Sequence, residues 1–175
     1  MDTNLTVKQI ENALIFGSGM FSVRNDIIIP NLSWGLLNHE ADLAIINKTG
    51  YLTEIEIKRS LADLRADFKK DVYHCDERVY NFYYCIPIGI KEKALEVFDQ
   101  HQDKIMDMLG ITTYHQPALL LYDECGQITH GGGWPYKHGR KLFLEERLTV
   151  ARLASCRYWD MRKKQIIGEQ QTLNF

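Results

Sequence analysis

The segment His39–Ser60 reads HEADLAIINKTGYLTEIEIKRS and contains two apolar runs with the composition of buried β-strands. Asp42 interrupts the first run, and Glu56 and Lys58 interrupt the second. The turn sequence KTG between the runs predicts a hairpin of two antiparallel strands. Because side chains alternate along a strand, we expect Glu54, Glu56 and Lys58 on one face of the second strand. The segment therefore predicts charged groups where strands normally bury apolar side chains.

Further helices and strands are expected on both sides of this hairpin. Apolar periodicity and turn residues predict helices over 6–16, from Ser60 onwards, over 91–110 and over 145–164. The same patterns predict strands over 32–37, 79–88, 117–123 and, at an edge, within 124–133. In the last helix the expected inward residues are Leu144, Leu148, Ala151 and Ala154. The order α-β-β-β-α-β-α-β-β-α predicts an α/β fold with a mixed central sheet flanked by helices.

Length and composition are those of one globular domain over residues 1–175. Hydrophobic residues make up 45% and charged residues 25%, which is ordinary for such a domain. No apolar run is long enough to predict a membrane span, and the first residues do not predict a secretory signal. The four cysteines are widely spaced, which favours a reduced, cytoplasmic protein. The net charge of −2 argues against coating nucleic acid by charge alone, but it allows a local basic face.

The two strands of the hairpin suggest a metal site. Strands that are paired lie about 5 Å apart, so Asp42 can meet Glu56 near the strand ends. Two unpaired carboxylates that face each other repel, and a divalent cation such as Mg²⁺ or Mn²⁺ removes that repulsion. Lys58, on the same face, could then position water or stabilise charge on a phosphate. This reading predicts metal-assisted phosphodiester hydrolysis, and the alternative is a solvated hairpin face with a surface ion pair.

The pattern of Asp42, thirteen residues, then Glu56-Ile57-Lys58 resembles the D-x(n)-(D/E)-x-K signature of the PD-(D/E)XK nuclease superfamily. The stretch EIKRSLADLRADFKKDVYHCDERVYNFYYCIPIGI is similar to the MmcB-type DNA-repair branch, and the similarity covers about residues 38–160. It implies a restriction-endonuclease-like fold with core order α-β-β-β-α-β. It also implies that Asp42, Glu56 and the Ile57 carbonyl bind the metal and that Lys58 is catalytic. The sequence departs from the signature at Ala41, which stands where proline is expected.

Basic residues follow the motif directly. Arg59, Arg65 and Lys69, with the neighbouring Lys70, could bind DNA phosphates. They could equally balance the acids of the same segment, which are Asp63, Asp67 and Asp71. The sequence leaves both readings open.

Several other polar residues are ambiguous. Glu40 and Glu54 are in phase with Asp42 and Glu56, so each is either an additional ligand or the wetter end of a strand. Glu11, on the first helix, either completes the site or faces solvent. The six histidines lack a ligand spacing on any one helix, so histidine chemistry is not expected.

A glycine-rich segment at 129–141 is ambiguous as well. It could place Trp134 or Tyr136 against a base, or it could be a plain hairpin loop.

Together these observations predict a Mg²⁺- or Mn²⁺-dependent DNA endonuclease or exonuclease that could act as a homodimer. The resemblance implies a role in DNA repair or in processing foreign DNA. The alternative is a catalytically inactive nuclease-fold module that binds DNA or forms complexes.

Overall fold

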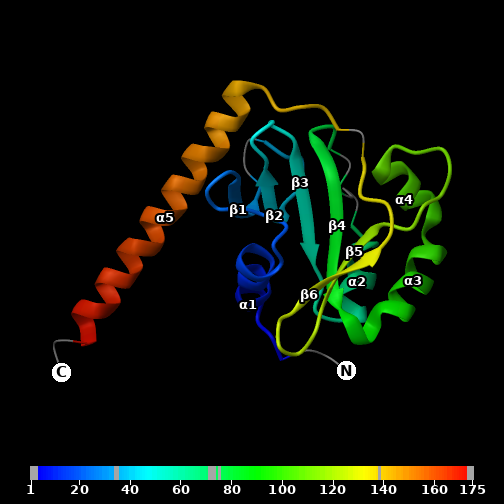
Figure 1. Cartoon of the computed structure of the whole chain (residues 1–175), viewed down its shortest axis with the longest axis horizontal. Helices are drawn as coiled ribbons and strands as arrows, with labels where there is room; N and C mark the ends of the chain where they lie inside the picture. The colour runs from blue at the N-terminus through cyan, green and yellow to red at the C-terminus, as the bar shows by residue number, and fades with distance from the viewer. Residues whose placement is uncertain (1–3, 34–35, 71–73, 75, 138, 173–175) are drawn as a thin grey trace.

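A six-stranded mixed β-sheet forms the centre of the molecule (Figure 1). The computed structural model describes residues 4–33, 36–70, 74, 76–137 and 139–172. The strands lie in sequence order and are β1 (Ile27–Leu32), β2 (Ala41–Ile46), β3 (Leu52–Ile57), β4 (Val79–Pro87), β5 (Ala118–Tyr122) and β6 (Ile128–Gly132). β1, β2 and β3 are antiparallel, β3, β4 and β5 are parallel, and β6 returns antiparallel to β5.

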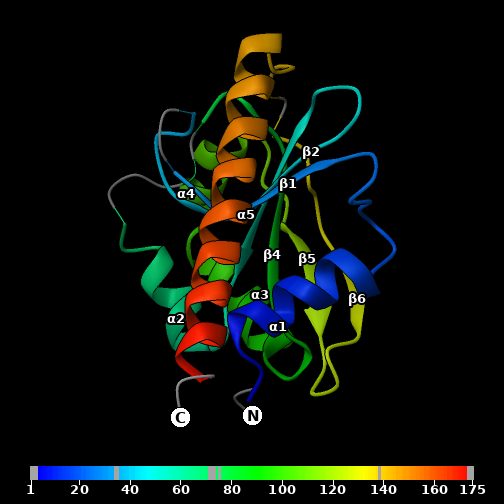
Figure 2. The ribbon, with the colours of Figure 1, turned by 90° about the vertical axis from the view of Figure 1, so that its left-hand side faces the viewer.

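Helices flank both faces of the sheet (Figures 1 and 2). They are α1 (Val7–Asn12), η1 (Ala13–Gly17), α2 (Leu61–Asp67), η2 (Ile88–Ile90), α3 (Lys91–Gln100), α4 (Gln102–Leu109) and α5 (Leu144–Thr172). On one face α1 buries Ile10 against β2 and β3, and on the other α2, α3 and α4 pack over a larger apolar core. The predicted α/β class with a mixed sheet between helices is confirmed. Within the described residues, every helix is too short or too polar to cross a bilayer.

The β2–β3 hairpin forms where the sequence predicts it. The side-chain oxygen of Asn47 accepts hydrogen bonds from the backbone N–H groups of Thr49 and Tyr51, at 3.0 and 3.1 Å. Gly50 completes the turn with φ of +93°, a conformation that glycine adopts without the strain of a side chain. The turn sets a register in which Leu43 pairs with Ile55, one residue from the predicted Asp42–Glu56 pair.

β3 is buried along its whole length, between β2 and β4. Ile55 and Ile57 join the apolar cluster under α1, while Glu54 and Glu56 face the layer of α2 and α3. The predicted alternation is confirmed. The alternative of a solvated hairpin face is wrong, because Glu54, Glu56 and Lys58 are only 0%, 1% and 4% exposed.

Two predicted elements differ from the structure near β1 and α3. The strand expected at 32–37 lies earlier, as β1, and residues 34–35 fall outside the described part. β1 continues through Pro30 because an edge strand tolerates a residue without an N–H donor. The helix expected over 91–110 divides at His101, whose φ of −123° is not helical and whose ring bonds the Val97 carbonyl.

The C-terminal helix presents a different face from the one expected. Leu144 and Leu148 are 59% and 60% exposed, so their predicted inward position is wrong. Val150 is the buried residue of the first turns, with Leu153 and Ala154 packed partly against the core. α5 meets the body of the molecule mainly along β1 and then extends beyond it (Figure 1). The helix therefore packs against the edge strand β1 over part of its length, and it does not bury a continuous apolar stripe.

Candidate functional site

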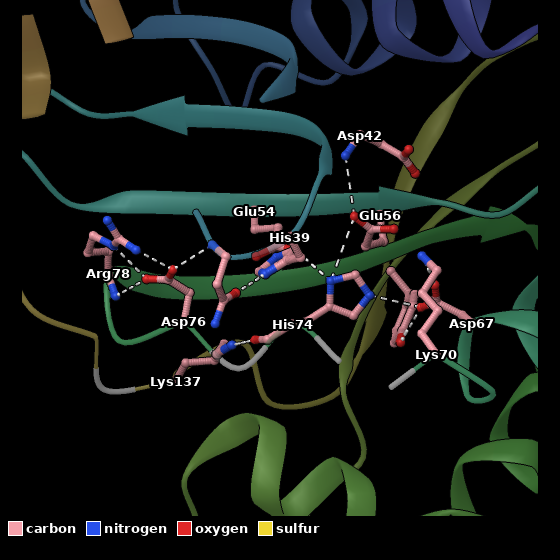
Figure 3. A network of polar contacts seen from close by, with 12 residues as sticks. His39, Asp42, Glu54, Glu56, Asp67, Lys70, His74, Asp76, Arg78 and Lys137 are labelled. Carbon is pink, nitrogen blue, oxygen red and sulfur yellow. Dashed lines mark hydrogen bonds and ion pairs between the residues drawn. The ribbon is translucent and has the colours of Figure 1, made fainter. Parts of the chain in front are cut away.

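The predicted triad lies at the ends of β2 and β3, but its two acids do not face each other as expected. The Asp42 backbone N–H, rather than its carboxylate, is directed at Glu56 Oε1, at 3.3 Å (Figure 3). The Asp42 carboxylate instead accepts a hydrogen bond from the Ile57 N–H at 2.8 Å. The two acids therefore meet at the strand ends, but each carboxylate accepts a backbone N–H of the other strand instead of facing the other carboxylate directly. A metal ion held by both acids stays a prediction. Antiparallel pairing ends at Leu43, which frees Asp42 to cap the end of β3.

Protein cations lie beside the buried acids of this site. Lys58 Nζ lies 2.7 Å from Glu56 Oε2 and 3.0 Å from Asp67 Oδ1. Asp67 is placed there by α2, which begins when the Ser60 hydroxyl accepts a hydrogen bond from the Asp63 N–H. Burial opposes the charge on Lys58, but these two carboxylates outweigh it and raise the pKa of Lys58. Lys58 is thus a buried, charged lysine held between an acid of β3 and an acid of α2.

A second group of polar residues continues the cluster along β3. His74 donates or accepts at both ring nitrogens, with Nδ1 at 2.7 Å from Glu54 Oε1 and Nε2 at 3.0 Å from Asp67 Oδ2. His39 Nε2 lies 2.7 Å from the same Glu54 oxygen. The Tyr84 hydroxyl donates to Asp67 Oδ2 at 3.0 Å. Glu54, Glu56, Lys58, Asp67 and His74, all buried, form one connected network, which we call the β3 polar cluster.

The network sets the charge of its members. Burial opposes ionisation of Glu54, but hydrogen bonds from His39 and His74 prevail and lower its pKa to about 2. Burial alone would lower the pKa of His74, but Asp67 and Glu54 raise it to about 9. Burial raises the pKa of Glu56 to about 7, with Asp42 and Glu54 acting in the same direction. Glu56 is therefore the acid of this cluster that most readily exchanges its proton.

The raised pKa of His74 predicts a loss of stability at alkaline pH. A protonated His74 stabilises the fold fully below its unfolded pKa of about 6.5, and this contribution disappears as the pH rises through about 9. Each pKa unit corresponds to about 1.4 kcal/mol, so the free energy of unfolding should fall by up to about 3 kcal/mol over that range. Urea denaturation of the protein at pH 6.5 and at pH 9 measures the difference.

Two variants separate His74 from general alkaline effects. His74→Gln should lose most of the difference between the two pH values, whereas His130→Gln, at an exposed position on β6, should keep it. Equal stability of the wild type at both pH values would contradict a protonated His74.

The remaining predicted residues lie around the cluster. Ile57 contributes its N–H to Asp42, as described above. Arg59, Arg65 and Lys69 are exposed, and they lie respectively before α2, on it and just after it. Lys70 bonds Asp67 Oδ1 at 2.6 Å, which supports the charge-balancing reading for that lysine. Asp71 and His138 lie outside the described residues.

The acids Glu40, Glu54 and Glu11 differ in their exposure to solvent. Glu40 is exposed, whereas Glu54 is fully buried, so the wetter strand end fits only Glu40. Glu11 is half-buried, and burial together with the neighbouring Asp42 charge raises its pKa. Glu11 is therefore electrostatically coupled to Asp42 from the opposite layer of the fold.

The glycine-rich segment follows the sheet instead of forming a plain loop. After β6, Trp134 and Tyr136 make isolated β-bridges to Pro117 and Asn81. The Trp134 ring is stacked on His115, with centroids 4.9 Å apart, so it is already engaged within the fold. Tyr136 is 42% exposed and is the more accessible of the two rings.

Sequence reasoning missed four members of the site. Asp67 was expected only to balance nearby cations, and His39 and His74 were set aside because they lack a helical ligand spacing. Tyr84 is part of no motif in the sequence, yet its hydroxyl bonds Asp67. The signal that could have indicated Asp67 is its spacing from the Ser60 cap. Seven residues are about two helical turns, which place Asp67 at the end of a short helix that directly follows β3.

The donor set of the cluster fits a divalent cation. Glu56, Asp67 and His74 each present a ligand atom, and these three atoms lie within 4.8 Å of one another. A second group with the same property consists of His39, Glu54 and His74. Asp42 belongs to neither group, although one of its carboxylate oxygens makes no hydrogen bond to the described residues. Carboxylate oxygens are the ligands that Mg²⁺ and Mn²⁺ prefer.

Comparison with known proteins supports the fold alone. No family model matches the chain, and no curated protein matches it. One solved structure, described as "SPO1766 protein of unknown function from Silicibacter pomeroyi", is similar with a TM-score of 0.51. The two sequences are 18% identical, and the alignment covers 81% of this chain and 83% of the other. The similarity concerns the arrangement of helices and strands over most of both chains.

Proposed function

We propose that the chain is a metal-dependent nuclease that hydrolyses phosphodiester bonds in DNA with Mg²⁺ or Mn²⁺. One observation carries the proposal: Asp42, Glu56 and Lys58 meet in one hydrogen-bonded unit at the adjoining ends of β2 and β3. The order α1, β1, β2, β3, α2, β4 supports a restriction-endonuclease-like fold. The resemblance of residues 38–160 to the PD-(D/E)XK superfamily points in the same direction.

Each residue of the unit has a proposed role. Glu56 is the central metal ligand, and Asp42 is the second carboxylate, from the neighbouring strand. A bound Mg²⁺ or Mn²⁺ would supply Lewis-acid activation of the phosphate and of the attacking water. Lys58 holds Glu56 in place and carries the positive charge that can stabilise a developing phosphate anion.

Exposed basic residues near the site could bind a DNA substrate. Arg59 follows Lys58 directly, Arg65 lies on α2, the helix that carries Asp67 to the cluster, and Lys69 lies just beyond the end of that helix. Positively charged side chains of this kind bind phosphate groups and fix the position of the protein on the nucleic acid. We propose that these three residues bind DNA phosphates beside the half-buried Asp42.

The second candidate is a non-cleaving module that keeps this fold and binds DNA or forms a complex. It is favoured by the burial of Glu56 and Lys58, which are 1% and 4% exposed, and by their mutual neutralisation. In this case the cluster would serve the stability of the fold, and the basic surface of α2 would carry the function.

Cleavage assays with several DNA forms distinguish the two candidates. The purified chain, incubated with duplex, single-stranded, flap and junction DNA, should cleave at least one form with Mg²⁺ or Mn²⁺ and none with a chelator. Glu56→Gln should lower the rate at least about 100-fold, because it removes a charged ligand from the reacting centre. Glu40→Gln, at an exposed position just before β2, should leave the rate unchanged.

The same reactions report on the alternative. DNA binding without metal-dependent cleavage, at equal affinity for the wild type and Glu56→Gln, supports the non-cleaving module. Cleavage that survives Glu56→Gln would place the reacting centre elsewhere on the chain. An RNA substrate in the same series shows whether the enzyme acts on RNA instead.

A further inference from the structure

Two histidine rings converge on one carboxylate oxygen at the inner end of the β3 polar cluster. His39 Nε2 and His74 Nδ1 each lie 2.7 Å from Glu54 Oε1 (Figure 3). The ring centroids are 4.9 Å apart, and the planes are nearly perpendicular, at 87°. The three residues come from separate parts of the chain, so local sequence does not impose this meeting.

The hydrogen-bonding roles of His74 make this arrangement unusual. An ionised Asp67 can only accept, so His74 Nε2, at 3.0 Å from it, carries a hydrogen. A neutral imidazole has one N–H, which leaves a lone pair on Nδ1 pointing at an anionic oxygen of Glu54. Such a contact at 2.7 Å requires a positive charge shared by the two atoms, which is a second ring proton in the metal-free chain or a metal ion coordinated by both.

His39 repeats the same pattern. Its Nδ1 lies 2.7 Å from the Asn38 side-chain oxygen, which is an acceptor, while Nε2 faces Glu54. Metal-binding histidines almost always donate their other N–H to a carboxylate or carbonyl oxygen, which fixes the tautomer and the ring orientation. Asp67 and Asn38 occupy these positions for His74 and His39.

The unused oxygen of Glu54 is the independent sign of a missing ligand. Glu54 is fully buried, and its Oε2 has no hydrogen-bond partner within the part of the chain that the structure describes. A buried carboxylate oxygen without a donor is costly, and native proteins rarely leave one. A cation held by both imidazoles and this carboxylate would compensate for the missing hydrogen bond to Oε2.

The surroundings hold the three residues in place without the cation. Glu54 is fixed at the centre of the sheet, and the His74 carbonyl accepts a hydrogen bond from Lys137. The Asn38 N–H, next to His39, donates to Asp76 at 3.1 Å, and Asp76 is paired with Arg78 at 2.6 Å. A preorganised site of this kind does not need to reorganise when the ion binds.

We propose that His39, Glu54 and His74 form a binding site for a divalent transition metal such as Zn²⁺. Two imidazoles and one carboxylate suit Zn²⁺, Co²⁺, Ni²⁺ or Fe²⁺, whereas Mg²⁺ prefers oxygen ligands. The site is distinct from the Asp42–Glu56 unit at the strand ends, and it stands whether or not the chain cleaves DNA.

Metal titration of the chelator-treated full chain tests the site. Co²⁺ should bind with visible absorption bands that depend on the two histidines, and Zn²⁺ should raise the melting temperature and compete with Co²⁺. His39→Ala should weaken both metals more than about 100-fold, because losing an outer partner of a ligand already costs about 10–100-fold. Imidazole ¹⁵N spectra of the wild type should show two rings shifting on addition of Zn²⁺.

Two controls and three contrary results complete the test. His130→Ala, on exposed β6, and Asp42→Asn should each keep the wild-type affinity. The proposal is wrong if the wild type binds neither metal, if His39→Ala binds as the wild type does, or if Asp42→Asn weakens Zn²⁺ as strongly as His39→Ala. His39→Gln provides the same comparison if the alanine variant does not fold. Loss of DNA cleavage has no bearing on any of these readouts.

Discussion

Lys58→Met is expected to lower the free energy of unfolding by about 3–5 kcal/mol. The substitution keeps most of the side-chain length but removes the ammonium that lies 2.7 Å from Glu56 and 3.0 Å from Asp67. Removing one partner of a buried ion pair leaves uncompensated charge in a medium of low polarity, and this costs about that much. Urea denaturation with an unchanged m-value measures the loss.

A second substitution should recover much of that stability. Lys58→Met leaves the carboxylates of Glu56 and Asp67 without the lysine charge. In Glu56→Gln/Lys58→Met one of these two groups is neutral, so the double variant should be more stable than Lys58→Met alone. The control is Lys69→Met, at an exposed position just after α2, which should change the stability by less than about 1 kcal/mol. A loss below about 1 kcal/mol for Lys58→Met would show that the lysine is not a structural counter-charge.

This result decides how any loss of activity is interpreted. A lysine in the D…E-x-K pattern invites the conclusion that an inactive Lys58 variant has lost a catalytic group. In this fold the same variant is also expected to weaken the protein, so inactivity alone does not assign a catalytic role. A double variant that is folded and stable but still inactive separates the two explanations.

The fold was largely predictable because its signals are local. The hairpin follows from alternating residues around an Asn47–Gly50 turn, and α2 follows from the cap at Ser60. The errors arise where tertiary contacts override local pattern. Pro30 signals the end of a strand in isolation, but at the edge of the sheet it costs no ladder bond. In α5 the apolar spacing predicts a buried stripe, but the helix meets the body of the molecule mainly along β1, and Leu144 and Leu148 stay exposed.

The candidate site was predictable only in part. Alternation along β3 places Glu54, Glu56 and Lys58 on one buried face, and this needs no knowledge of the rest of the chain. What completes the cluster comes from other elements. Asp67 arrives from α2, and His39 and His74 lie outside the helices and strands, at positions that no spacing rule connects to β3. For this reason the sequence indicated a metal or an ion pair as the counter-charge, but it could not indicate that His74 contributes to it.

Asp67 is the acceptor on which this network depends, and Asp67→Asn should lower the free energy of unfolding by about 3 kcal/mol or more. Its carboxylate accepts from Lys58 and Lys70 at Oδ1 and from His74 and Tyr84 at Oδ2. Asparagine keeps one acceptor oxygen and replaces the other with an NH₂ group, which would face donors. At least one buried donor then loses its partner, and Lys58, Lys70 and the protonated His74 lose a counter-charge, which together cost about this amount.

Asp63→Asn is the matched control on the same helix. Asp63 is exposed, and its carboxylate accepts only the Arg59 N–H among the described residues, a role that the asparagine oxygen can fill. This control should change the stability by less than about 1 kcal/mol in the same urea experiment. Equal effects of the two substitutions would mean that Asp67 acts only as one more surface charge on α2. A large effect at Asp67 alone would instead show that α2 is fastened to β3 through buried charge, with Asp67 as the residue that orients both Lys58 and His74.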